Sequence, residues 1–78
     1  MELKPGHRVC FCFCSTERVH LAKVYDGTSN RFLGTFNHPQ EITTEELEHF
    51  INAKAAEHAL VAVMKIPQMP WNFYIERP

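Results

Sequence analysis

The segment from Arg8 to Ser15 alternates cysteine with larger apolar side chains, so both of its faces are apolar. Successive side chains of an extended chain point to opposite faces of a sheet, and a strand that is apolar on both faces is typical of a sheet interior. We therefore expect this segment to be an interior strand. One predicted face carries Val9, Phe11 and Phe13, and the other carries Cys10, Cys12 and Cys14.

Two further extended segments follow this first strand. Arg18 to Tyr25 is rich in valine and leucine, and the third segment runs from Arg31 to Phe36. Between them Asp26 and Gly27 open a turn, because aspartate favours turns and glycine adopts a positive φ at no steric cost. The three segments together predict an antiparallel meander.

A helix is predicted from Thr44 to about His58. Thr43 and Glu46 stand three residues apart, which is the spacing of a capping box at a helix start. Apolar residues then recur at helical spacing, as expected for a helix that buries one stripe against a sheet. That stripe consists of Leu47, Ile51 and Ala55, with Phe50 at its edge.

The end of the chain predicts one or two more strands. Leu60 to Ile66 is apolar on every side and rich in β-branched residues, which favours a fourth strand, although a helix that continues to Met64 is the alternative. Trp71 to Glu76 alternates apolar and polar residues and predicts a half-buried strand at a sheet edge. The expected fold class is α+β, with a small antiparallel sheet of four to five strands packed on one α-helix.

Size and composition limit the classes of protein. The chain has 78 residues, 45% of them hydrophobic, which suits a single folded domain over residues 1–78 rather than a disordered chain. The longest apolar run, Ala59 to Met64, is too short to span a bilayer, and Met1 to His7 lacks the apolar stretch of a signal peptide. The formal net charge of −1 does not favour coating of nucleic acid. We expect a cytoplasmic protein without a membrane partner.

The three cysteines, at positions 10, 12 and 14, are the candidate metal ligands. A straight strand spreads three thiols over about 13 Å, which is too far for one zinc ion. Their odd number and tight clustering also speak against a secreted disulfide scaffold. We expect reduced thiols that pack as small apolar side chains under a helix, with no metal and no cofactor.

Catalytic signals are absent from the sequence. His20 on the second predicted strand could reach a cysteine, but no nucleophile elbow and no paired carboxylates accompany it. The three glycines, at positions 6, 27 and 34, form no phosphate-binding pattern. A domain of this size also offers little room for a substrate pocket. We therefore expect that the protein is not an enzyme and has no catalytic residues.

Charge is distributed unevenly along the chain. Residues 1–40 carry five basic and three acidic side chains, whereas residues 41–78 carry three basic and six acidic ones. The helix dipole accounts for two of the carboxylates near the predicted helix start. The alternative interpretation is an acidic patch that steers the chain to a basic surface. The patch consists of Glu41, Glu45, Glu46 and Glu48.

The predicted sheet has more apolar surface than one helix can cover. If the helix covers one side, aromatic side chains such as those of Phe11 and Phe13 remain for a partner, which is another protein or a second copy in a homodimer. Alternatively, the segment after residue 59 folds over the second face.

Small size, free thiols, the acidic patch and the lack of a catalytic signature favour a non-enzymatic protein-binding module. The specific hypothesis is a small phage- or plasmid-type inhibitor of a bacterial nucleic-acid-handling complex, similar to the anti-CRISPR proteins. Its partner would be a protein, or a protein–nucleic-acid complex, with a basic surface.

The alternative hypothesis is a small DNA-binding module that uses the hairpin over residues 18–31. The run from Arg31 to Phe36, followed by an acidic helix start, resembles the sheet-plus-helix units of plant AP2 domains and integrase arm-binding domains. The resemblance implies a three-stranded sheet laid into the major groove. This chain departs from that pattern in its near-neutral charge and in the lack of a basic sheet face, so we expect a protein rather than nucleic acid as the partner. The candidate nucleic-acid-binding residues are Arg18, His20, Lys23 and Arg31.

Overall fold

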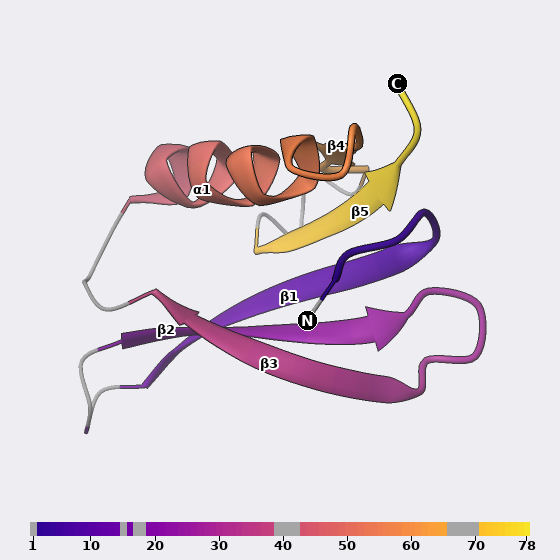
Figure 1. Ribbon diagram of the computed structural model, residues 1–78. Coiled ribbons are helices and arrows are strands. Elements are labelled where there is room, and N and C mark those ends of the chain that lie inside the picture. The colour runs from indigo at the N-terminus through magenta and orange to yellow at the C-terminus, as the bar shows by residue number, and fades with distance from the viewer. Residues whose placement is uncertain (1, 15, 17–18, 39–42, 66–70) are drawn as a thin grey trace.

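The chain folds into a five-stranded antiparallel sheet with one helix on one of its faces, which confirms the predicted α+β class (Figure 1). This computed structural model describes residues 2–14, 16, 19–38, 43–65 and 71–78, with the backbone alone at 14, 19, 20, 36–38 and 44. The elements are β1 (His7–Cys14), β2 (Val19–Asp26), β3 (Phe32–His38), α1 (Thr44–Ala56), β4 (Val61–Val63) and β5 (Asn72–Glu76).

The strand order across the sheet is β3-β2-β1-β5-β4. The first strand is therefore central, as its apolar character on both faces predicted. The predicted meander is confirmed, because β1 pairs with β2 and β2 pairs with β3, both antiparallel. The prediction that the last strand lies at an edge is wrong, since β5 pairs with β1 on one side and with the short β4 on the other.

The segment after the helix becomes a strand, as predicted, but of its described residues only Val61–Val63 pair with the sheet, and Ile66 lies outside the described residues. The alternative of a helix that continues to Met64 is wrong, because α1 ends at Ala56. Ala59 takes a left-handed conformation with φ 57°, and the Leu60 amide donates to the Ala55 carbonyl at 3.0 Å. This is the hydrogen bond of a Schellman motif, which ends a helix by turning the chain away from its axis.

The helix begins where the sequence predicted. The Thr43 hydroxyl accepts a hydrogen bond from the Glu46 amide at 3.2 Å, and the Thr43 amide donates to the Glu46 carboxylate at 3.5 Å. Both bonds of a capping box are thus present, and they satisfy two amide groups that the first turn of a helix leaves unpaired.

Replacement of Thr43 by alanine removes the side-chain half of this cap. We expect the free energy of unfolding to fall by about 1 kcal/mol. Thermal melts followed by circular dichroism measure the change, and Thr43→Ser is the matched control, because serine keeps the hydroxyl. Equal stability of the alanine variant and the parent protein would show that the hydroxyl does not stabilise this helix.

The core lies between α1 and the face of the sheet that carries Val9 and Phe11. Leu47, Ile51 and Ala55 are fully buried, which confirms the predicted helix stripe. The remaining buried apolar side chains of the core cluster are Leu3, Val9, Phe11, Ala22, Val24, Leu60, Phe73 and Ile75.

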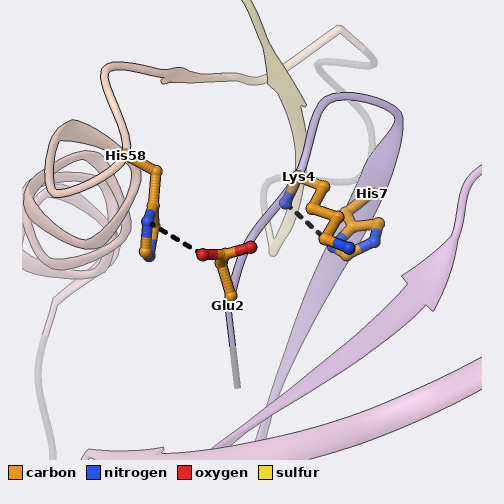
Figure 2. A network of polar contacts seen from close by, with 4 residues as sticks. All are labelled: Glu2, Lys4, His7 and His58. Atoms are coloured by element: carbon orange, nitrogen blue, oxygen red, sulfur yellow. Dashed lines mark hydrogen bonds and ion pairs between the residues drawn. The ribbon is translucent and has the colours of Figure 1, made fainter.

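The N-terminal segment closes one end of this core. Leu3 is buried in the core cluster, and the Gly6 amide donates to the Ile75 carbonyl at 2.9 Å. Glu2 places a carboxylate oxygen 3.9 Å from Nδ1 of His58 beyond the end of α1, as Figure 2 shows. The segment therefore joins the helix end to the strands.

His7 lies where this segment enters β1. Its Nδ1 accepts a hydrogen bond from the Lys4 amide at 3.2 Å (Figure 2). Partial burial lowers the pKa of His7, the Lys4 charge lowers it further, and the Asp26 carboxylate opposes the shift. The neutral imidazole is thus favoured in the folded chain, which suits its role as a hydrogen-bond acceptor.

The turn after β2 is organised by Asp26. Its carboxylate Oδ1 accepts hydrogen bonds from the amides of Thr28 at 2.9 Å and Ser29 at 3.1 Å. These bonds hold the pKa of Asp26 below its usual value, and the bond from the Ser29 amide contributes most to that shift. The expectation that aspartate opens this turn is confirmed, whereas Gly27 does not have the positive φ expected of it. Asn30 takes the left-handed conformation instead, with φ 60°.

Candidate functional site

Two exposed aromatic side chains mark one end of the sheet. Phe13 at the end of β1 is 42% exposed, and Trp71 just before β5 is 40% exposed. The Phe11 amide donates to the Trp71 carbonyl at 2.8 Å, which extends the pairing of β1 with β5 and holds Trp71 beside β1. A pocket of about 270 Å³ lies here, lined by Phe11, Cys12, Phe13 and Trp71.

The acidic start of the helix lies at this same end of the molecule. Figure 1 shows α1 beginning on the side where β1 ends and β5 begins. Glu45, Glu46 and Glu48 are exposed there, and Glu46 also closes the capping box. Glu41 lies outside the described residues. The structure thus brings three of the four predicted acidic residues to the end of the sheet that carries Phe13.

Phe11 has a different position from the one expected of a partner-binding residue. Its side chain is 3% exposed, and its ring lies edge-on to the rings of Phe50 at 6.2 Å and Phe73 at 5.9 Å between centroids. Phe11 therefore belongs to the core, and it contributes to the candidate surface only as a wall of the pocket. The reason is its place in the middle of β1, directly under α1.

The expectation that the cysteines pack under the helix is wrong for Cys10 and Cys12. Val9 and Phe11 take that face of β1, so Cys10 and Cys12 lie on the opposite face, where both are half-buried free thiols. The Cys12 thiol is 3.8 Å from the Leu21 carbonyl oxygen. The side chain of Cys14 lies outside the described part. Among the described residues, no group of three metal-ligating side chains is close enough to hold an ion.

The face of the sheet away from α1, called the open face below, is covered by none of the described helices or strands. The described strands after residue 59, β4 and β5, do not fold over it, because both lie within the sheet. Cys10 and Cys12 lie on this face, as do Leu21 and Lys23 of β2.

One row of side chains crosses the open face from β4 to β3. The strand register aligns Val63 with Tyr74, Tyr74 with Arg8, Arg8 with Tyr25, and Tyr25 with Phe32. We call the four residues Tyr74, Arg8, Tyr25 and Phe32 the aromatic row.

Two cations lie over rings of this row. The Arg8 guanidinium carbon is 4.7 Å from the centre of the Tyr25 ring, and one of its amino groups donates to the Asn72 side-chain oxygen at 2.9 Å. Lys65 places its ammonium 5.3 Å from the centre of the Tyr74 ring and pairs with Glu76. Both contacts have cation–π geometry and hold the cations on the open face.

The structure describes the side chains of two of the four residues predicted for nucleic-acid binding. Lys23 is half-buried on the open face, and Arg31 is exposed just before β3. Arg18 and the side chain of His20 lie outside the described part. Sequence reasoning missed Arg8, Lys65 and Tyr74 as candidate site residues. The alternation of Trp71 to Glu76 does place Tyr74 on the sheet face opposite Phe73 and Ile75. Only the strand order, however, shows that Tyr74 lies beside Arg8.

Comparison with known proteins gives no relative. The chain matches no protein-family model, no curated protein and no solved structure. No helix within the described ranges is long and apolar enough to cross a membrane.

Proposed function

We propose that the chain is a non-enzymatic protein-binding module whose contact surface is the end of the sheet that carries Phe13 and Trp71. The observation that supports this most is the pair of exposed aromatic side chains, 42% and 40% exposed, around a pocket of about 270 Å³. Aromatic residues, tryptophan above all, supply much of the binding energy in protein interfaces. A pocket between them would receive a side chain of the partner.

The partner carries a basic surface around its apolar centre. Glu45 and Glu48 are exposed at the start of α1, on the side of the molecule where β1 ends, and would form the charged rim of the interface. Charges at a rim increase the association rate with a partner of opposite sign. Basic surfaces of this kind are typical of complexes that hold nucleic acid.

The specific form of the proposal is an inhibitor of a bacterial nucleic-acid-handling complex, as in the anti-CRISPR proteins. A chain of 78 residues with an acidic helix start can cover part of a basic groove without any catalytic step. The free thiols of Cys10 and Cys12 support a cytoplasmic setting, where thiols stay reduced.

Charge reversal at the helix start tests this proposal. A partner is first captured from a bacterial lysate and identified by mass spectrometry, and its binding kinetics are then measured with purified proteins. Glu45→Lys should lower the association rate about tenfold at low salt, with a smaller loss as salt rises. Glu57→Lys is the matched control, because it makes the same charge change at the exposed far end of the helix.

Replacement of an aromatic residue completes the same test. Trp71→Ala should increase the dissociation rate, since it removes apolar contact area rather than charge. If neither Glu45→Lys nor Trp71→Ala affects binding beyond the Glu57→Lys control, this end of the sheet is not the contact surface. The proposed function then fails in this form.

A further inference from the structure

We propose that the open face is a second binding surface, which takes two or three bases of a single-stranded nucleic acid along the aromatic row. This inference goes beyond the proposed protein contact, which uses another part of the molecule. The row spans four neighbouring strands, and because strands lie about 4.8 Å apart, Tyr74 and Phe32 are separated by about 14 Å. That length accommodates a few bases of an extended strand.

The side chains of the row have the chemistry that unpaired bases require. Single-stranded nucleic acids bind to sheets on which aromatic rings and guanidinium planes stack with the bases. Phe32 is 53% exposed at the edge strand, and its ring lies edge-on to Tyr25 with 5.6 Å between centroids. Arg8, held by Tyr25 and Asn72, presents a fixed guanidinium plane in the middle of the row.

The charge of the open face fits a polyanion. Arg8, Lys23 and Lys65 give it three cations, of which Lys65 is paired with the carboxylate of Glu76. Lys23 lies on β2 two residues from Tyr25, which places it about 7 Å along the strand from the row. Bases on the row would thus have a cation beside their phosphates, whereas the carboxylates at the start of α1 lie away from this face.

A second copy of the chain fits this face less well. In a symmetric dimer the same patch meets itself, so the cations Arg8 and Lys23 of one protomer would face a surface that carries the same cations. Like charges brought together and desolvated oppose such packing. The cations that disfavour self-association are the ones that favour a nucleic-acid strand.

Binding to short oligonucleotides tests the inference directly. Fluorescence anisotropy is measured with labelled oligothymidine, oligouridine and a duplex of equal length, at low and moderate salt. We expect both single strands to bind more tightly than the duplex, because paired bases cannot stack on side chains. The logarithm of affinity should fall with the logarithm of salt with a slope of no more than about 2, since at most three cations contact phosphates.

Phe32 separates stacking from simple apolar contact. Phe32→Leu should weaken single-strand binding about tenfold, whereas Phe32→Trp should retain it, because tryptophan keeps an aromatic face. Lys23→Gln should weaken binding and reduce the salt slope by about 0.7. Phe13→Leu is the matched control, since Phe13 is an exposed aromatic outside the open face and its variant should bind the oligonucleotides like the parent protein.

Three results would overturn the inference. One is the lack of any single-strand binding at low salt, and another is equal loss of binding in Phe32→Leu and Phe13→Leu. The third is a dimer in sedimentation that Phe32→Leu dissociates, which would assign the face to a second copy. The protein-contact proposal is tested at Glu45 and Trp71 instead, so either proposal can fail while the other stands.

Discussion

Replacement of Phe11 by alanine should lower the free energy of unfolding by about 3–5 kcal/mol. Phe11 is 3% exposed and packs edge-on against both Phe50 of α1 and Phe73 of β5. Its ring is therefore in contact with the helix and with a neighbouring strand at once, and alanine would leave a cavity between them. For a chain of this size, whose total stability is on the order of 5–10 kcal/mol, the loss is a large fraction.

Urea unfolding at equilibrium measures this change, and Phe13→Ala is the control. Phe13 is in the same strand and is the same residue type, but it is 42% exposed, so its replacement should cost about 1 kcal/mol or less. A similar loss of stability in both variants would mean that Phe11 is not more deeply buried than Phe13. Phe11 is also unsuitable for a test of partner binding, because its replacement would destabilise the fold whether or not the residue contacts a partner.

The sequence predicted which segments form helices and strands better than it predicted which of these elements lie side by side. Alternation fixed β1 as an interior strand, and the spacing of Thr43 and Glu46 located the helix start. Both signals are local, because they depend on side-chain direction and on bonds within one turn. The interior position of β5 was missed, since it depends on a three-residue strand, Val61–Val63, that pairs on its far side.

The candidate surfaces show the same limit. Both faces of β1 are apolar, so a period of two cannot indicate which face the helix covers, and the cysteines were placed on the wrong side. The aromatic row joins Arg8 near the start of the chain to Tyr74 near its end, and only the strand order makes them neighbours. The acidic helix start could be read directly, because its carboxylates are close in sequence.

Replacement of Gly27 by alanine should destabilise the protein by about 2–3 kcal/mol, although the residue lies in an exposed turn. A Cβ atom at this position would lie 2.4 Å from the Gly6 carbonyl oxygen. The Gly27 amide donates to that same oxygen at 2.8 Å, so the two backbones are held in direct contact. The clash is with backbone rather than with a flexible side chain, and it is relieved only if the turn and the N-terminal segment separate.

Separation at this contact would affect more than the turn. The Gly6 amide donates to Ile75 of β5, so movement of Gly6 also weakens the attachment of the N-terminal segment to the sheet. Amide hydrogen exchange should therefore become faster at Gly6 as well as in the turn, and urea unfolding should give the loss of stability.

Gly6→Ala and Thr28→Ala are the informative controls. Gly6 has a φ of +89° but open space around a Cβ, so alanine there meets backbone strain without a clash and should cost about 1 kcal/mol. Thr28 is exposed, and the bond of its amide to Asp26 survives in alanine, so Thr28→Ala should change stability little. If Gly27→Ala is no less stable than Thr28→Ala, the close approach of the two glycine backbones is absent in solution, and the N-terminal segment is not anchored through this turn.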